Sequence, residues 1–260
     1  MSTAGDVTLD VRGSVGLVTL NRPHARNAMT LEMYAELRDI MAGISPDGPL
    51  KAIIITGAGE KAFAAGTDIS KFRDFTTPQH ALDYESFMDD VLGKVETCPL
   101  PTIAAISGAC TGGGAAIAAC CDLRIATGRL RFGFPIARTL GNCLSMTNLA
   151  RLSELMGAAR VREMLFTSRL LEADEALSIG LVSELCDDHE TLMIEAFKLA
   201  DLLCSQAPLT LRATKEGLRR LRQVPPKADH DLITLCYGSQ DFKEGLEAFL
   251  AKRPAAWTGK

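Results

Sequence analysis

The stretch GACTGGGAAIAACCD, residues 108–122, decides the fold because it places a glycine-rich loop directly before an apolar run. Three consecutive glycines, Gly112 to Gly114, allow another group to approach the backbone closely. The run AAIAACC predicts a short buried helix that carries no acid, base or nucleophile beyond two cysteines. Apolar strands are expected on both sides, PTIAAIS before it and LRIAT after it. This order of strand, loop, helix and strand predicts an α/β fold with largely parallel pairing.

The residues before this stretch repeat the same alternation. Two β-rich runs at 7–13 and 15–21 flank Gly13-Ser14 and predict a hairpin. Thr30 is a suitable N-cap for a helix over 31–44, whose apolar residues recur at helical spacing. AIIITGAG, residues 52–59, is typical of a strand buried on both faces, and a further helix is expected around 78–96.

After about residue 145 the pattern becomes helical. Gly180 is expected to end one of these helices before a short strand at 181–185. QVPPKADH, residues 223–230, is the only proline-rich joint. A helical C-terminal part without its own sheet must bury its apolar faces on the core or on another subunit.

The amino-acid composition limits the classes of protein to which the chain can belong. The 260 residues are 47% hydrophobic and 23% charged, which is typical of a folded domain with a sizeable core. A net charge of -4 gives no electrostatic reason to expect nucleic acid or an anionic membrane as a partner. No signal pattern opens the chain and no apolar run is long enough to span a bilayer, so we expect a cytoplasmic protein.

The cysteines and histidines do not follow a metal-binding pattern. Eight cysteines include no CxxC pair, and the four histidines are scattered. A disulfide framework or a zinc site is therefore not expected, and no metal is predicted. Most cysteines are interpreted as small buried hydrophobic residues.

One motif resembles a nucleotide site. TGAGEKA, residues 56–62, matches a loose dinucleotide fingerprint after a strand. That fingerprint needs a helix to begin at once, whereas the chain continues with FAAGTD, which predicts a second loop. Dinucleotide binding is therefore disfavoured.

Two loops rich in small residues, FAAGTDIS at 63–70 and GACTGGG at 108–114, both follow buried strands. Their backbone N–H groups could point into a cavity without obstruction by side chains. Two such groups on one oxygen would form an oxyanion hole for a thioester or ester carbonyl. The alternative is that the glycines serve only tight turns and close packing.

Several motifs in the same order resemble the enoyl-CoA hydratase/isomerase (crotonase) family over nearly the whole chain. They are VGLVTLNRPHARNAM, AIIITGAGEKAFAAGTDIS, PTIAAISGACTGGG with CDLRIA, EADEALSIGLVSEL and KEGLEAFLAKR. The resemblance implies an α/β fold of the crotonase (ClpP/crotonase-like) kind, a spiral of ββα units with a helical C-terminal trimerisation region. It implies a core over 1–200, an oligomerisation region over 201–260, and a homotrimer or dimer of trimers. The implied substrates are acyl-CoA thioesters, with no separate cofactor because CoA is part of the substrate.

The resemblance also implies site residues. Its oxyanion hole falls on the backbone N–H groups of Thr67 and Gly113. Lys71 directly follows the segment in which the family carries a lysine, and Asp68 is interpreted as structural because the family carries it whatever the reaction. Arg253 lies beside Lys252 in the last helix, which resembles the part that reaches a neighbouring subunit's CoA phosphates; the alternative for these basic residues is a solvated face. The implied CoA-binding residues are His24, Ala25, Arg26, Ala65, Thr67, Asp68, Ile69 and Lys252.

The chain departs from the family at its two catalytic glutamates. Ala116 occupies the place of the first and Ile136 the place of the second. An aliphatic group can neither donate nor accept a proton, and general acid–base catalysis contributes about 10²–10⁴-fold. Water addition by the two-glutamate route is therefore not expected.

Other residues are candidates for the missing chemistry. Arg138 could hold a substrate carboxylate or pair with a local acid. Cys143 could be a nucleophile, although no histidine lies nearby in sequence and a buried structural role is the alternative. Glu85 and Asp89, about one helical turn apart, are the best remaining acids. Further candidates for the acyl pocket are Thr139, Asn142 and Ser145.

Three functional hypotheses follow. The first is an enzyme on acyl-CoA thioesters, a lyase or isomerase in fatty-acid or aromatic-acid catabolism, that stabilises an enolate through Thr67 and Gly113. The second is a decarboxylase or thioester hydrolase of the same fold. The third is a non-catalytic protein that binds CoA thioesters.

Overall fold

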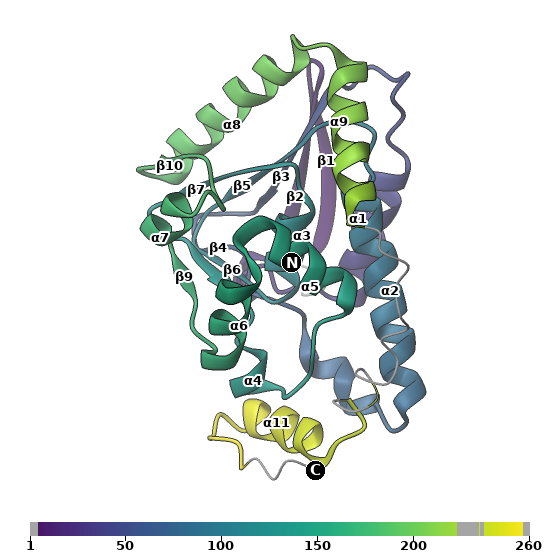
Figure 1. Ribbon diagram of the computed structural model, residues 1–260, viewed down its shortest axis with the longest axis vertical. Helices are drawn as coiled ribbons and strands as arrows, with labels where there is room; N and C mark the ends of the chain where they lie inside the picture. The colour runs from purple at the N-terminus through teal and green to yellow at the C-terminus, as the bar shows by residue number, and fades with distance from the viewer. Residues whose placement is uncertain (1–4, 223–233, 235–236, 257–260) are drawn as a thin grey trace.

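The computed structural model describes residues 5–222, 234 and 237–256, which form two sheets and the helices around them (Figure 1). The larger sheet has the order β1-β2-β3-β5-β7-β10, in which only the β1–β2 pair is antiparallel. Its strands are β1 (Asp6–Arg12), β2 (Val15–Asn21), β3 (Ala52–Gly57), β5 (Thr102–Ile106), β7 (Leu123–Thr127) and β10 (Leu185–Cys186). The smaller sheet consists of β4 (Ala62–Ala64), β6 (Ala109–Thr111), β8 (Arg131–Gly133) and β9 (Leu171–Glu172).

A unit of two strands and a helix recurs along the chain. Each unit puts a long strand into the larger sheet and a short strand into the smaller sheet, and then forms a helix. The units are β3-β4-α2, β5-β6-α3 and β7-β8-α4, whose helices are α2 (Pro78–Glu96), α3 (Gly113–Cys120) and α4 (Ile136–Thr139). The predicted spiral of ββα units is therefore confirmed.

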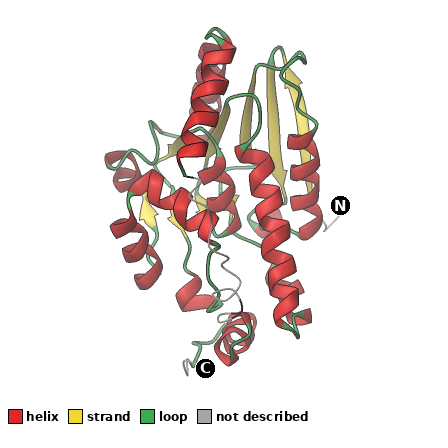
Figure 2. Ribbon diagram, turned by 45° about the vertical axis from the view of Figure 1, so that its right-hand side comes forward, coloured by secondary structure: helices red, strands yellow, loops and turns green. Residues whose placement is uncertain are grey.

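The core lies on both faces of the larger sheet because its strands alternate. Ile53 and Ile55 of β3 face the main core, together with residues of α1 (Leu31–Ala42), α2 and α3. Ile54 faces the opposite side, where α8 (His189–Cys204) covers the sheet with Leu192, Ala196 and Ala200. Figure 2 shows the helices in red and the strands in yellow, with α11 (Gln240–Leu250) at the bottom, far from the larger group of strands.

Several local predictions are confirmed. The hairpin pairs Arg12 with Val15, and the Thr30 side chain accepts a hydrogen bond from the Met33 amide at the start of α1. The helix around 78–96 has those bounds. After β3 the chain turns and enters β4, so no helix begins where a dinucleotide-binding loop would need one.

The strand predicted at 181–185 is shorter and later than expected. The Leu181 and Val182 amides both donate to the Ala176 carbonyl, which closes the end of α7 (Ala173–Ser178). β10 therefore includes only Leu185 and Cys186, which pair with β7.

After residue 145 the described part of the chain is mostly helical. Its helices are α5 (Met146–Met156), α6 (Ala158–Thr167), α7, α8, α9 (Pro208–Leu221) and α11 (Gln240–Leu250). α8 passes through residue 200 without a break, and the division of domains there stays a prediction. α9 exposes the apolar side chains of Leu209, Leu218 and Leu221. The proline-rich joint at 223–230 lies outside the described residues.

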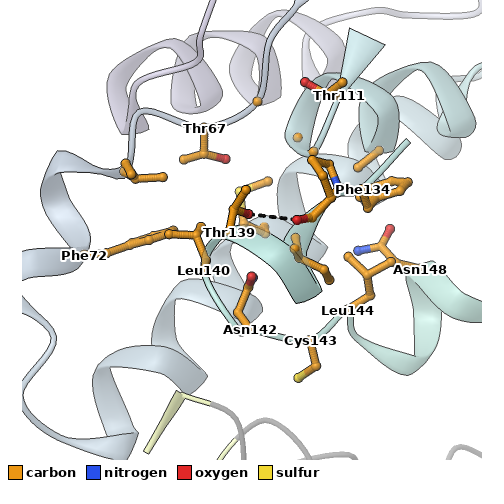
Figure 3. Close-up of a pocket in the computed structure, with 18 of the residues that line it drawn as sticks. Thr67, Phe72, Thr111, Phe134, Thr139, Leu140, Asn142, Cys143, Leu144 and Asn148 are labelled. Atoms are coloured by element: carbon orange, nitrogen blue, oxygen red, sulfur yellow. Dashed lines mark hydrogen bonds between the residues drawn. The ribbon is translucent and has the colours of Figure 1, made fainter. Parts of the chain in front are cut away.

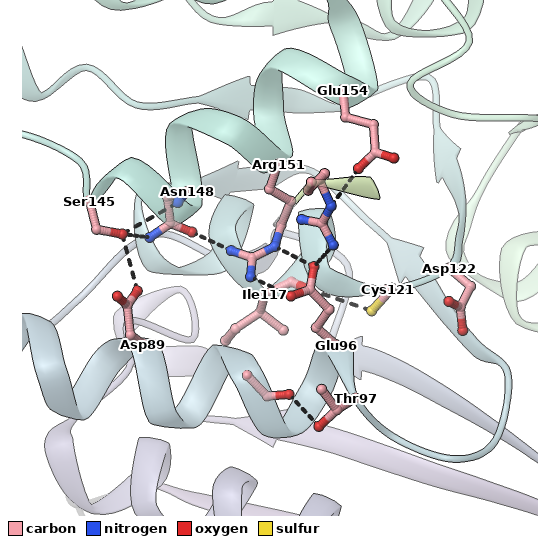
Figure 4. Close-up of polar contacts among 12 residues, drawn as sticks. Asp89, Glu96, Thr97, Ile117, Cys121, Asp122, Ser145, Asn148, Arg151 and Glu154 are labelled. Carbon is pink, nitrogen blue, oxygen red and sulfur yellow. Dashed lines mark hydrogen bonds and ion pairs between the residues drawn. The ribbon is translucent and has the colours of Figure 1, made fainter. Parts of the chain in front are cut away.

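A group of charged side chains, here called the charge cluster, joins α2, α5 and the end of α9. It consists of Glu96, Arg151, Glu154 and Arg222. Both Glu96 oxygens accept from Arg151 at 2.9 Å, and Asn148 also accepts from Arg151 at 2.7 Å (Figure 4). Burial raises the pKa of Glu96, but Arg151 and Arg222 outweigh it, so the pKa lies below its usual range. The cluster therefore fastens the C-terminal helices to α2 by charge.

Candidate active site

A cavity of about 160 Å³ lies between the loop at 65–69, α2, the start of α3 and the segment 134–144 (Figure 3). Most of its lining is apolar, as is typical of small-molecule sites. The two loops that the sequence singled out both reach this cavity, through Thr67 and Gly113.

The Thr67 N–H points away from the segment around Met29, which pairs with the Thr67 loop. Met29 donates to the Gly66 carbonyl at 2.9 Å and accepts from the Asp68 amide at 2.8 Å, in the manner of a parallel bridge. In such a bridge the residue between the two bonded groups turns its own N–H to the other side. Within the described part of the chain no backbone carbonyl accepts from the Thr67 N–H.

The Gly113 amide is the first of α3, where a helix leaves its N–H groups without partners and carries partial positive charge. A Cβ built at Gly113 would lie 1.8 Å from the Tyr34 hydroxyl oxygen and 3.1 Å from Thr67 Oγ1. The loops are thus in contact, and only glycine fits at position 113. The touching loops therefore carry two backbone N–H groups, those of Thr67 and Gly113, with no backbone carbonyl partner among the described residues.

A chain of partly buried hydroxyl groups supports the Thr67 loop. The Tyr34 hydroxyl lies 2.9 Å from Thr67 Oγ1, which lies 3.3 Å from the Tyr84 hydroxyl. Burial raises the pKa of both tyrosines, so both phenols stay protonated at neutral pH. The Thr67 side chain is therefore held between two neutral hydroxyl groups, one of which, Tyr84, lines the cavity.

The two positions where the family carries glutamates both line the cavity. Ala116 follows Gly113 by one turn of α3, and Ile136 begins α4. The cavity therefore presents aliphatic carbon at both places, and neither residue can transfer a proton.

Of the two acids that the sequence singled out, Glu85 lines the cavity and Asp89 does not. Glu85 Oε1 accepts a hydrogen bond of 2.5 Å from the Tyr237 hydroxyl. Asp89 accepts from Ser145, which caps α5. Glu85 is therefore the acid that can meet a ligand here.

Comparison with known proteins assigns the family. A profile of enoyl-CoA hydratase/isomerase matches residues 10–260. The chain belongs to this family. It is 34% identical to the short-chain-enoyl-CoA hydratase of Clostridium acetobutylicum over 252 residues, 95% of each chain. It is 33% identical to the crotonyl-CoA hydratase of Syntrophomonas wolfei over 259 residues, 98% of each chain.

Solved structures agree with this assignment. The crystal structure of an enoyl-CoA hydratase/carnithine racemase from Magnetospirillum magneticum superimposes with a TM-score of 0.79 at 34% identity. The match covers 100% of this chain and 97% of that one. The chain therefore has the crotonase fold of the enoyl-CoA hydratase/isomerase family.

The remaining candidates for the acyl pocket separate into two groups. Thr139, Asn142 and Cys143 line the cavity, whereas Arg138 is exposed and Ser145 is occupied as a helix cap. The Cys143 sulfur points away from Thr67 in Figure 3. The structure therefore offers no support for Arg138 as a ligand inside the cavity or for Cys143 as a nucleophile aimed at the oxyanion hole.

The other cysteines behave as hydrophobic residues. Burial raises the pKa of Cys120 to about 11, and it raises the pKa of Cys110 and Cys121 as well, so these thiols stay protonated. Cys236 lies outside the described residues. In the described ranges, no three His, Cys, Asp or Glu side chains are grouped as a metal ion would require. Nor is any helix in these ranges long and apolar enough to cross a membrane.

Three of the residues implied for CoA, Ala65, Thr67 and Ile69, line the cavity. The Ala65 amide donates to the Arg26 carbonyl, which connects the 65–69 loop to His24, Ala25 and Arg26. Asp68 pairs with Arg22 at 2.9 Å and caps the short 3-10 helix η2 (Ile69–Asp74), as its structural interpretation requires. Lys252 is exposed after α11, and Arg253 pairs with Glu244. Their roles toward CoA stay predictions.

Three tyrosines of the site were missed in the sequence. Tyr34 occupies one of the regularly spaced apolar positions of its helix, so it resembles an ordinary core residue. Tyr84 lies in a polar helix, so it resembles an ordinary surface residue. Tyr237 lies beyond the proline-rich joint, and no local pattern indicates that it meets Glu85. Their convergence depends on the packing of segments far apart in sequence.

Proposed function

We propose that the protein binds an acyl-CoA thioester and stabilises negative charge on its carbonyl oxygen through the Thr67 and Gly113 amides. The observation that carries this proposal is the pair of backbone N–H groups on touching loops beside an apolar cavity. The Thr67 N–H donates to no backbone carbonyl in the described ranges, and the Gly113 N–H lies at the start of α3. Such preorganised donors act on an enolate-like oxygen, the intermediate of lyase and isomerase chemistry at the carbon beside a thioester.

The lining supports a neutral acyl group. Glu85 is the carboxylate at the cavity, and no Lys or Arg side chain among the described residues lines it. A negatively charged acyl group, such as a decarboxylase of malonyl-type substrates would bind, would meet no Lys or Arg side chain among the described lining residues. This observation disfavours decarboxylation relative to enolate chemistry on an uncharged acyl chain.

The test isolates the carbonyl oxygen. Calorimetry compares butyryl-CoA with its thioether analogue, S-butyl-CoA, which keeps the chain and the nucleotide but lacks the oxygen. Two hydrogen bonds of about 1 kcal/mol each predict that the thioester binds at least about tenfold more tightly. Equal dissociation constants would refute the oxyanion hole, and binding of neither compound would refute the CoA assignment.

Hydration of crotonyl-CoA is expected to be slow. Ala116 and Ile136 both line the cavity, so glutamates at these positions would place their carboxyl groups in it. Combining Ala116→Glu with Ile136→Glu should therefore raise the hydration rate above that of the wild type by at least about 10²-fold. The loss of the conjugated thioester absorbance measures this rate. Ala116→Gln with Ile136→Gln is the matched control because it adds similar volume without an acid. A wild-type rate equal to that of the glutamate variant would contradict the prediction.

A further inference from the structure

One part of the cavity wall is polar. Glu85, Asn142 and Tyr237 form a connected group among apolar neighbours such as Phe72 and Leu140. The Tyr237 hydroxyl donates to Glu85 Oε1 at 2.5 Å and accepts from Asn142 Nδ2 at 3.2 Å. All three residues line the cavity, although they come from α2, from the segment after α4 and from the C-terminal part of the chain. The group therefore belongs to the ligand space.

One hydrogen-bond acceptor of this group, Asn142 Oδ1, receives no hydrogen bond from the described residues. This oxygen atom is buried. Exchanging the amide oxygen and nitrogen would not satisfy it, because the Tyr237 proton is already donated to Glu85. A buried acceptor without a donor costs about 1–3 kcal/mol, so such an atom in a binding cavity indicates a missing donor.

The direction of these bonds is fixed by charge. Burial and the neighbouring Glu85 both raise the pKa of Tyr237, so the phenol remains a donor to the carboxylate. Asn142 is in turn held by its donation to Tyr237. In Figure 3 the Asn142 oxygen is directed toward the middle of the lining residues. The acceptor is therefore held in place toward the ligand.

The chemistry of the occupant follows from these contacts. A plain alkyl chain would leave the Asn142 oxygen unpaired, and an ionised carboxylate has no proton to donate to it. A hydroxyl group supplies the donor without adding charge. We propose that the acyl group bound in this cavity carries a hydroxyl group along its chain, which donates a hydrogen bond to Asn142 Oδ1. This inference rests on the proposed acyl-CoA function and narrows its substrate class.

Pairs of ligands test the inference. Calorimetry compares hexanoyl-CoA with hexanoyl-CoA bearing a hydroxyl at C4, C5 or C6, so that chain length and nucleotide stay constant. We expect at least one hydroxylated ligand to bind about tenfold more tightly than hexanoyl-CoA, since sites built for a hydroxyl discriminate against analogues without it. If hexanoyl-CoA binds and no hydroxylated ligand binds more tightly, the inference is wrong while the proposed function stands. If no thioester binds, both are wrong.

Variants assign the preference to Asn142. Asn142→Leu should remove the tenfold advantage of the hydroxylated ligand over hexanoyl-CoA. Tyr237→Phe keeps the ring but removes the group that anchors Asn142, and it should reduce the advantage even if Asn142→Leu does not fold. Thr139→Val is the matched control, because the Thr139 hydroxyl already donates to the Pro135 carbonyl at 3.0 Å. An advantage that survives in both Asn142→Leu and Tyr237→Phe would overturn the assignment.

Discussion

Gly113→Ala is expected to reduce turnover of a thioester substrate by about 10²–10³-fold, the usual cost of one oxyanion donor. The new Cβ would lie 1.8 Å from the hydroxyl oxygen of Tyr34, a side chain with 0% exposure. Either Tyr34 or the first turn of α3 must move: movement of the helix displaces the Gly113 amide, and movement of Tyr34 breaks its hydroxyl contact with Thr67. The same overpacking should lower the free energy of unfolding by about 1–3 kcal/mol. Thioester turnover and urea denaturation measure the two effects.

A second substitution distinguishes the effect of the steric clash with Tyr34 from the effect of losing glycine at position 113. Tyr34→Phe removes the hydroxyl oxygen, after which the nearest atom to the new Cβ is the ring carbon Cζ at 3.0 Å. The double variant should therefore recover part of the activity and stability lost in Gly113→Ala. Tyr34→Phe alone is the control, since it also removes the hydrogen bond to Thr67. Full activity in Gly113→Ala would contradict the predicted displacement of the Gly113 amide.

Arg151→Met is expected to lower the free energy of unfolding by about 3 kcal/mol, because it leaves the charge cluster without its most buried cation. The Arg151 side chain is 3% exposed, and it donates to both Glu96 oxygens and to Asn148. Arg222 still pairs with Glu96, which keeps the loss at the lower end for a broken buried pair. Arg131→Met is the matched control: Arg131 and Glu172 form an exposed pair, worth about 0–1 kcal/mol. Equal losses in both variants would contradict a special role for the cluster.

The same cluster predicts a dependence on pH. The pKa of Glu96 is lowered in the folded protein, so its contribution to stability is fully present above the unfolded value of about 4.3. It is lost as the pH falls through the folded pKa. The difference in unfolding free energy between wild type and Glu96→Gln should therefore be large at pH 7 and shrink below about pH 4. A difference that stays constant with pH would show that Glu96 acts through packing alone.

Local sequence signals predicted most of the fold. The hairpin around Gly13, the cap at Thr30 and the bounds of α2 each depend on residues close together in the chain, and all are confirmed. The short β10 was predicted too early because the amides of Leu181 and Val182 close a helix instead of joining the sheet. Nothing in the residues themselves distinguishes these two uses of an apolar segment.

The site was less predictable because its contacts are made across long distances in sequence. The glycine-rich loops indicated Thr67 and Gly113, and the model brings these loops together. The pairing of Glu85 with Tyr237, 152 residues apart, has no local signal. Arg138 follows Ile136 by two residues, yet the short α4 turns it to the surface while Ile136 faces the cavity. The direction of a side chain on so short a helix depends on what packs around it.

The helix α2 serves two purposes at once. Near its middle it supplies Tyr84, Glu85, Met88 and Leu92 to the cavity, and its last residue, Glu96, belongs to the charge cluster. A substitution that loosens the cluster can therefore shift the cavity wall, about one to three turns away, without touching a ligand. Selection for thermal stability and selection for a new substrate would both act on α2. Gains in one of these properties should therefore reduce the other in this protein.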